Sequence, residues 1–130
     1  MEINDKIKYW LELADYDFET AKVMLMTKRF LYVGFMCQQS VEKALKALYV
    51  KTKNEIPPKL HSLSLLISKI GIENEISDYY SNIIDKLEPL NIEARYPTYK
   101  DEIFKTLTIE YCQTIIDESF ELLSWIKTKL

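Results

Sequence analysis

The sequence contains little of what builds elaborate loops and little of what builds chemical centres. Its 130 residues include two glycines, four prolines, two cysteines and one histidine. No glycine-rich phosphate-binding loop occurs, which excludes the nucleotide sites that depend on one. No apolar run reaches the roughly 20 residues that cross a bilayer, and the first residues lack the apolar core of a secretory signal. We therefore expect a cytoplasmic protein without a membrane span.

The two cysteines, Cys37 and Cys112, do not form a Cys-x-x-Cys spacing. Both fall within helical patterns, and free cysteine is among the most often buried residue types. We interpret them as buried thiols rather than as a disulfide or a metal site. No metal and no cofactor are expected.

Arginine is also scarce, since only Arg29 and Arg95 occur among 17 basic residues. The formal net charge is −3. This negative net charge argues against a broad basic surface for sequence-independent DNA binding. It is compatible with a local basic patch. Because arginine is the side chain suited to bidentate phosphate contacts, the two arginines are natural candidates for an anion site.

What the sequence does contain is apolar residues at helical spacing over most of its length. Steps of three and four residues predict helices over 5–28, 31–52, 63–70, 76–88 and 101–130. No segment alternates as a strand does, and 130 residues make one domain, 1–130. The prediction is an all-α protein: an antiparallel up-down bundle of four long helices with one short helix in the second connection.

The stretch 37–50 is the clearest helix, with small and apolar residues on one face. Gly34 and Cys37 lie on that face, where small side chains let another helix approach closely. Gln38 falls inside the apolar arc, so we interpret it as satisfying polar groups of the bundle. The helix is expected to line the bundle core or a dimer seam.

Prolines set the other boundaries. Pro57 and Pro58 require a loop, and Pro89 should kink or stop the fourth helix near Glu88. Pro97 disfavours the helical conformation for the residue before it. The segment 91–100 is therefore predicted to be an ordered, exposed loop that precedes the final helix.

Four pieces of sequence, in this order and spacing, resemble the HEPN domain over nearly the whole chain. They are Trp10 with Ala14-Asp15-Tyr16-Asp17, then Cys37-Gln38-Gln39-Ser40-Val41-Glu42-Lys43-Ala44-Leu45-Lys46-Ala47-Leu48, then Pro58-Lys59-Leu60-His61-Ser62-Leu63, then Ala94-Arg95-Tyr96-Pro97. The resemblance implies a helical bundle that often pairs as a homodimer and binds a nucleotide or RNA. It also implies a partner, because many prokaryotic members are encoded beside a minimal nucleotidyltransferase as a toxin–antitoxin pair.

Other members of that family are metal-independent ribonucleases, in which an arginine is followed a few residues later by a histidine. Here the residues from Tyr96 to Ile103 that follow Arg95 include no histidine. Metal-free RNA cleavage needs a proton acceptor and donor beside the 2′-hydroxyl, and histidine supplies both near neutral pH. Tyr99 or Lys100 would need a strongly lowered pKa to replace it. From the resemblance we therefore expect the protein to bind a nucleotide or RNA but not to cleave it. A metal-independent endoribonuclease and a pure protein-interaction module are the alternatives.

Arg95 and Tyr96 form the leading candidate site. A guanidinium group can grip a phosphate, and an aromatic ring can stack on a base. The alternative is that Arg95 pairs with Glu93 or Glu88 and only pins the loop. In the family, a tyrosine close behind the missing histidine can be modified by the partner transferase, so the resemblance makes Tyr99 a candidate acceptor with an incomplete motif.

Four further residues complete the candidate nucleotide or RNA site. His61 could donate a hydrogen bond to a ligand, but ordering the loop before a short helix is the favoured role. Lys59 beside it would add positive potential. Gln39 and Lys43 lie where a nucleotide or a dimer partner could reach.

Aromatic residues are plentiful, with nine tyrosines, five phenylalanines and two tryptophans. Aromatic side chains are typical anchors of protein interfaces, so they favour a homodimer. The alternative is a core with generous aromatic filling.

Overall fold

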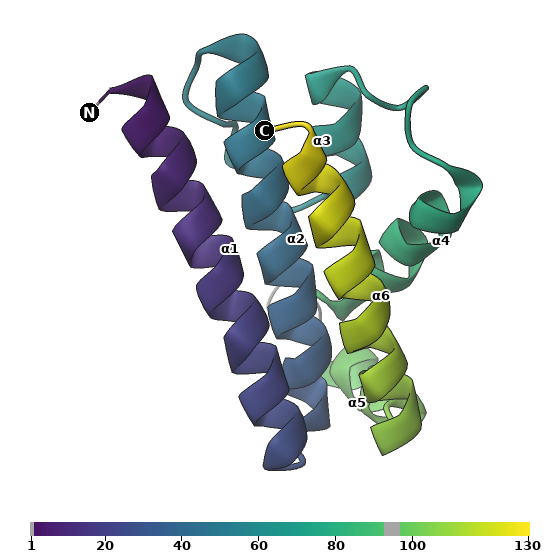
Figure 1. The fold of residues 1–130 in the computed structure, drawn as a ribbon. Coiled ribbons are helices and arrows are strands. Elements are labelled where there is room, and N and C mark those ends of the chain that lie inside the picture. Colours follow the sequence, from purple (N-terminus) through teal and green to yellow (C-terminus); the bar gives the residue numbers. More distant parts are fainter. Residues whose placement is uncertain (1, 93–96) are drawn as a thin grey trace.

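The structure is a computed structural model that describes residues 2–92 and 97–130, with only the backbone for 97–100. Within these residues the chain is helical and has no strand, which confirms the all-α class (Figure 1). The elements are α1 (Ile3–Met26), α2 (Phe30–Lys53), α3 (Leu63–Ile70), α4 (Asp78–Leu87), the 3-10 helix η1 (Glu88–Leu90), α5 (Pro97–Thr106) and α6 (Ile109–Thr128).

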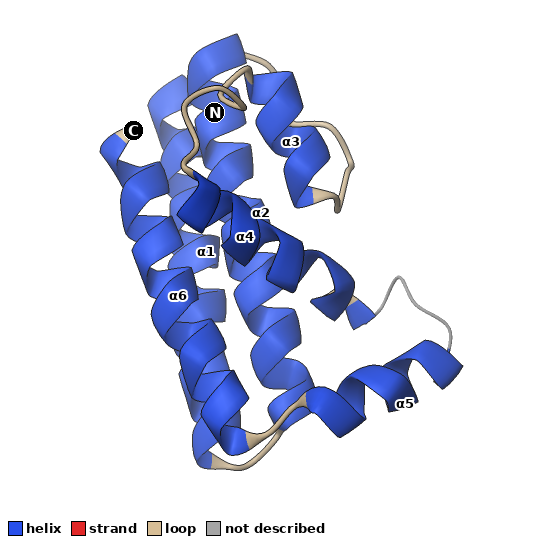
Figure 2. Cartoon of the chain, turned by 90° about the vertical axis from the view of Figure 1, so that its right-hand side faces the viewer, coloured by secondary structure: helices blue, strands red, loops and turns tan. Residues whose placement is uncertain are grey.

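Helix α2 is the centre of the fold. It contacts α1, α3, α4, α5, η1 and α6, so it is packed on several sides. Helix α1 runs in the direction opposite to α2 and α6, as Figure 1 shows. The shorter α3 and α4 lie across the other side of the α2–α6 layer, and α5 lies beyond one end of α4 (Figure 2). The predicted core role of the 37–50 stretch is thus confirmed.

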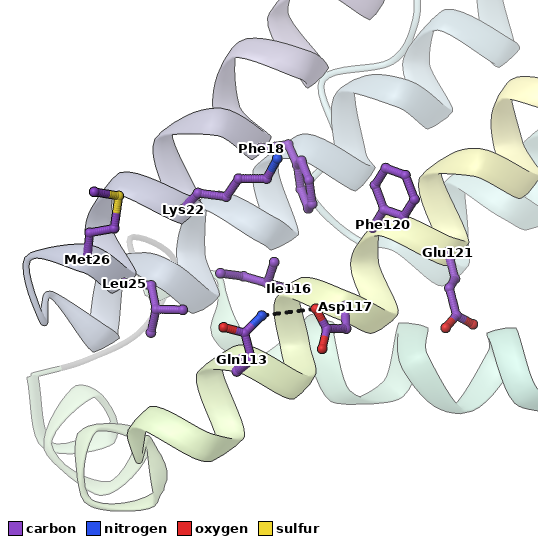
Figure 3. Close-up of a pocket in the computed structure, with 9 residues that line it drawn as sticks. All are labelled: Phe18, Lys22, Leu25, Met26, Gln113, Ile116, Asp117, Phe120 and Glu121. Atoms are coloured by element: carbon purple, nitrogen blue, oxygen red, sulfur yellow. Dashed lines mark hydrogen bonds between the residues drawn. The ribbon is translucent and has the colours of Figure 1, made fainter.

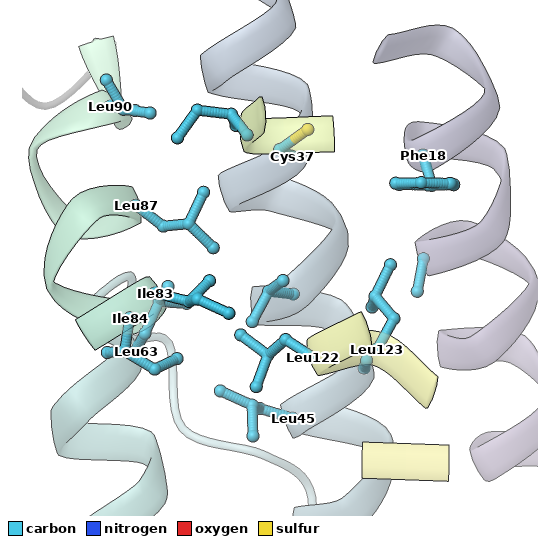
Figure 4. Packing of buried hydrophobic residues seen from close by; sticks show 14 of the residues in the cluster. Phe18, Cys37, Leu45, Leu63, Ile83, Ile84, Leu87, Leu90, Leu122 and Leu123 are labelled. Atoms are coloured by element: carbon cyan, nitrogen blue, oxygen red, sulfur yellow. The ribbon is translucent and has the colours of Figure 1, made fainter. Parts of the chain in front are cut away.

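The core is built from fully buried aliphatic side chains of four helices. Leu45 of α2, Leu63 of α3, Leu87 of α4 and Leu122 of α6 are each at most 1% exposed and lie in one cluster (Figure 4). Burying one such side chain is worth about 1.5–3 kcal/mol. The core therefore ties the short helices to the long ones.

Gly34 allows the closest approach to α2. A Cβ atom placed on Gly34 would lie 3.0 Å from Cδ1 of Leu90, which is tighter than ordinary packing. The small residue thus lets η1 settle against the central helix. This close approach was the expectation for the small face of 37–50, although the neighbour is a 3-10 turn rather than a long helix.

Local capping and terminating residues set the ends of the short helices. Ser62 caps α3, because its Oγ accepts a hydrogen bond from the backbone N–H of Leu65 at 3.2 Å. Gly71 ends the same helix in the left-handed region with φ of 91°. Helix α4 ends at Leu87, and Pro89 lies in η1, so the predicted stop near Glu88 is confirmed.

Two boundary predictions are wrong. The helix expected over 101–130 is divided, because α5 ends at Thr106 and Thr108 caps a new helix by accepting from the backbone N–H of Tyr111 at 3.1 Å. The fourth helix is short, so the long helices among the described residues are α1, α2 and α6 instead of the four expected. The apolar residues keep their helical spacing across Thr108, but the cap made by this threonine starts a new helix there.

The exposed loop expected over 91–100 is also corrected. Asn91 and Ile92 are buried, and Pro97 begins α5. Proline is well suited to the first turn of a helix because its missing N–H would have no partner there. Proline therefore starts a helix at this position, where the sequence pattern predicted only a loop.

Candidate functional site

A buried carboxylate, Glu42, lies at the centre of a polar cluster on α2. Its side chain is 3% exposed, and its Oε2 accepts a hydrogen bond from Nζ of Lys46 one turn later at 3.2 Å. Its Oε1 lies 3.1 Å from Nδ1 of His61, whose side chain is 63% exposed. Because a carboxylate only accepts hydrogen bonds, this contact places a proton on Nδ1. In the neutral ring, Nε2 is then the acceptor.

Gln38 extends the cluster from α2 to the loop before α3. Its Nε2 donates to the backbone carbonyl of His61 at 3.0 Å and lies 3.4 Å from Oε1 of Glu42. Its Oε1 accepts from Nε2 of Gln39 at 2.7 Å. The fully buried amide is therefore satisfied on both sides, as its place in the apolar arc predicted.

Lys43 faces a different neighbour. Its Nζ donates to Oδ2 of Asp17, which is a buried residue of α1. One turn of α1 earlier, the carbonyl of Ala14 accepts from Oγ of Ser40 at 2.7 Å. These two contacts fix α1 against α2, and the first of them offsets the charge of Lys43 within the chain.

The turn that carries His61 is also held from the end of α4. Oε1 of Glu88 accepts hydrogen bonds from the backbone N–H groups of Leu63 and Ser64, the latter at 3.1 Å. A carboxylate is favourable at this place because the N-terminus of a helix carries partial positive charge. The end of α4 and the start of α3 lie close together (Figure 2). The polar cluster thus adjoins η1, which leads into the segment that contains Arg95.

The structure places the predicted site residues unequally. Arg95 and Tyr96 lie outside the described residues, and Tyr99 lies in α5, of which only the backbone is described at that position. Gln38 links His61 and Gln39, because its side chain hydrogen-bonds to the backbone of one and to the side chain of the other. The spacing of these residues in the sequence did not predict that link. A binding role for these residues stays a prediction.

Lys59 and Lys43 are placed differently from each other. Lys59 is exposed in the loop before α3, where its charge can face solvent or a ligand. Lys43 is engaged by Asp17, so only part of its side chain faces outward. Their roles in a nucleotide site likewise stay predictions.

A hollow of about 280 Å³ lies between η1, α5 and the start of α6. It is lined by described residues close in sequence to Tyr99, among them Glu102 and Ile103. Lys86 also reaches it and donates to the two carboxylate oxygens of Glu118 at 3.0 and 3.2 Å. No sequence pattern indicates this hollow, because its lining comes from elements that are separate in the chain.

Both cysteines are free and fully buried, which confirms their interpretation as core thiols. Burial raises the pKa of Cys37 from 9.0 to about 12 and that of Cys112 to about 11. A thiol with so high a pKa stays protonated near neutral pH and is a poor nucleophile. Neither cysteine is a candidate catalytic group.

Together these features define a small all-helical domain whose central helix carries a buried Gln–Glu–Lys cluster tied to a histidine-bearing loop. The model of the HEPN domain matches residues 7–129, so the chain belongs to the HEPN domain family. Among the described residues, none of the helices is both long and apolar enough to cross a membrane.

Two known proteins are similar to the chain. A protein named putative toxin MJ1304, from Methanocaldococcus jannaschii, is 32% identical over 104 residues, which cover 77% of this chain and 67% of that protein. The crystal structure of TT1696 from Thermus thermophilus superimposes with a TM-score of 0.80 at 21% identity, covering 96% of this chain and 98% of that one. The second likeness concerns the fold alone.

Proposed function

We propose that this protein is the HEPN component of a toxin–antitoxin pair, that it binds RNA or a nucleotide as a homodimer, and that a minimal nucleotidyltransferase is its partner. Support for the toxin–antitoxin context comes from the family match over 7–129 and from the relative that is named a toxin. Support for an anion site comes from Arg95, one of two arginines in the chain.

One observation favours binding over cleavage: the sole histidine of the sequence does not follow Arg95. It is His61, which precedes α3 and contacts the buried Glu42. A general base must come within hydrogen-bond reach of the proton that it removes. With no histidine behind Arg95, the family's arginine–histidine arrangement is incomplete in this chain.

A ribonuclease remains the second candidate because of one feature of the cluster. A buried carboxylate that holds Nδ1 of a histidine, while the rest of the ring is exposed, is also how proteins orient a general base. Under this alternative His61 accepts the proton of the 2′-hydroxyl. Metal-independent cleavage that is lost in both His61→Ala and Arg95→Ala would establish it.

The experiment is a binding assay of the purified chain with labelled RNA and a panel of nucleotides, in the presence of a chelator. Arg95→Ala should weaken binding about tenfold or more, because a hydrogen bond to a charged group contributes about 1.5–3 kcal/mol. Arg29→Ala is the matched control, since Arg29 is the other arginine and is exposed at the turn before α2.

Unchanged affinity in a folded Arg95→Ala protein would reject Arg95 as the site. If no RNA binds and no nucleotide shifts the melting temperature of the wild type, the pure interaction module becomes the better interpretation. Incubation with a minimal nucleotidyltransferase and a nucleotide, followed by mass spectrometry of wild type and Tyr99→Phe, tests the acceptor.

A further inference from the structure

A groove of about 680 Å³ lies between α1 and α6, and Glu42 and its polar partners do not line it (Figure 3). Phe18 of α1 and Phe120 of α6 face each other in this groove, with ring centroids 6.0 Å apart. Phe120 is 59% exposed, and Met26, which also lines the groove, is 81% exposed. Large apolar side chains left this open beside a hollow are typical of an interaction surface.

The groove continues along both helices. A second hollow, of about 300 Å³, shares Phe18 and Phe120 with the first and extends the lining to Asp15 of α1 and Lys127 of α6. Because a helix rises about 1.5 Å per residue, the stretch of α1 from Asp15 to Met26 is roughly 17 Å long. This length corresponds to about three helical turns, so a helical segment of another molecule can lie along the groove.

Two lysines line the groove, and each is ion-paired within the chain. Nζ of Lys22 lies 3.0 Å from Oε1 of Glu19 on the same helix, α1. Nζ of Lys127 lies 2.6 Å from Oδ1 of Asp15, and this pair joins α6 to α1. The positive charge of each lysine is therefore offset by a carboxylate of its own.

The carboxylates of Asp117 and Glu121 on α6 have neutral partners instead. Oδ1 of Asp117 accepts a hydrogen bond from Nε2 of Gln113 at 3.0 Å (Figure 3). A hydrogen bond with Glu121 raises the pKa of the Tyr79 hydroxyl above its ordinary value. Among the described residues, no basic side chain lies within ion-pair distance of either carboxylate. The α6 wall of the groove is therefore acidic, without a counter-charge from those residues.

We propose that this groove binds a basic amphipathic helix of a partner protein, an interaction that goes beyond RNA or nucleotide binding. The apolar face of the partner helix covers Phe18, Phe120 and Met26, which is how amphipathic helices dock into apolar grooves. Lysine or arginine residues one turn apart on its flank face Asp117 and Glu121. Those two carboxylates are four residues apart on α6, so they too are spaced by about one turn.

Other occupants fit these charges less well. The phosphates of a nucleic acid or of an anionic lipid are repelled by Asp117 and Glu121. A second copy of the chain, laid groove against groove, brings Lys22 and Lys127 to the contact, but both are already paired. It therefore offers the acidic wall no free positive charge. A partner helix with lysine or arginine on its flank supplies that charge.

The first test is the affinity of the full chain for three labelled synthetic peptides, measured by fluorescence anisotropy. One peptide is an amphipathic helix of leucine and lysine. The second keeps the leucines but has glutamate in place of lysine, and the third is a scrambled form of the first that has no apolar face. The wild type should bind the leucine–lysine peptide about tenfold or more tightly than either of the others.

Substitutions in the groove test the place of binding. Phe120→Ala and Met26→Ala should each weaken binding of the leucine–lysine peptide about tenfold or more, because each removes an apolar anchor. Ile56→Ala is the matched control, since Ile56 is 80% exposed in the loop before α3. Phe120 and Met26 are themselves largely exposed, and thermal melting by circular dichroism verifies that the variants fold.

Reversal of charge tests the chemistry of the partner. The pair Asp117→Lys with Glu121→Lys should reverse the preference, so that the glutamate peptide binds more tightly than the lysine peptide. The control pair is Glu12→Lys with Glu73→Lys, which changes the net charge equally at exposed positions outside the groove. It should keep the preference for the lysine peptide.

Equal affinity of the wild type for the leucine–lysine peptide and its scrambled form would overturn the inference. Binding that survives both Phe120→Ala and Met26→Ala would do so too, as would a preference that the reversal at Asp117 and Glu121 leaves unchanged. Sedimentation in which Phe120→Ala dissociates a wild-type dimer would assign the groove to a second copy instead. RNA and nucleotide binding are measured on the same samples. Peptide binding in the groove without any RNA or nucleotide binding contradicts the proposed function alone.

Discussion

Nδ1 of His61 lies 3.1 Å from Oε1 of Glu42, although one residue is largely exposed and the other is buried. The contact joins the loop before α3 to the central helix. The same carboxylate accepts from Lys46 at 3.2 Å, and the ammonium group of Lys46 lies 5.5 Å from the centroid of the Trp10 ring. One carboxylate therefore organises groups from α1, α2 and the loop.

Replacing that carboxylate should be costly. Glu42→Ala removes one partner of a buried pair and leaves the ammonium group of Lys46, whose side chain is 9% exposed, without its counter-charge. We expect a loss of about 3 kcal/mol in the free energy of unfolding. Urea denaturation followed by circular dichroism measures it.

Glu12→Ala is the control for this prediction. Glu12 also pairs with a lysine one turn away, Lys8, but at 3.7 Å and with both side chains largely exposed. Its removal should cost less than about 0.5 kcal/mol. Equal effects of the two substitutions would contradict the structural role assigned to Glu42.

The buried thiols should make stability fall at high pH. The pKa of Cys37 is raised from 9.0 to about 12 by burial, so between these values the unfolded chain loses a proton that the folded chain keeps. Stability is then fully present below pH 9 and decreases as the pH rises above it. Denaturation at a series of pH values measures the slope, which should be shallower in Cys37→Ala.

The same burial predicts slow chemical modification. Both thiols should resist a thiol reagent in the native protein at neutral pH and react fully once the chain is unfolded. Rapid labelling of either thiol under native conditions would contradict its burial. Mass spectrometry identifies which of the two is labelled.

Gly71 provides a prediction about backbone conformation alone. It has φ of 91°, and no atom lies within 4 Å of the position that a Cβ would take. Gly71→Ala should therefore destabilise the protein by about 1 kcal/mol through backbone strain, without a clash. Thermal unfolding measures the change.

Asn54 offers the opposite substitution for comparison. It ends α2 with φ of 55°, a conformation that glycine adopts without strain. Asn54→Gly should be neutral within a few tenths of a kcal/mol or slightly stabilising. A stable Gly71→Ala protein would show that the turn after α3 can adopt another conformation.

Much of the fold could be predicted from the sequence because its signals are local. The helical period, the capping Ser62 and the terminating Gly71 act within one turn of the chain, and Pro89 ended α4 where expected. The break before α6 depends on a local signal too. Thr108 stands in an apolar pattern that continues on both sides of it, so the helical period gives no sign of the break that its cap makes.

The candidate site could be predicted only in part. The positions of Gln39, Lys43 and His61 in the sequence made them candidates, but they did not show which contacts these residues make. Those contacts depend on residues distant in the chain, such as Asp17 for Lys43. The role of Arg95 remains a prediction of the sequence.

By itself the sequence determined that this chain is a helical HEPN domain in which no histidine follows Arg95. Only the tertiary structure decided that Glu42 is buried against His61 and that α1 and α6 leave a groove between Phe18 and Phe120. The physical reason is that helix formation depends on neighbours along the chain. Burial and contacts between distant residues depend instead on which helix faces meet.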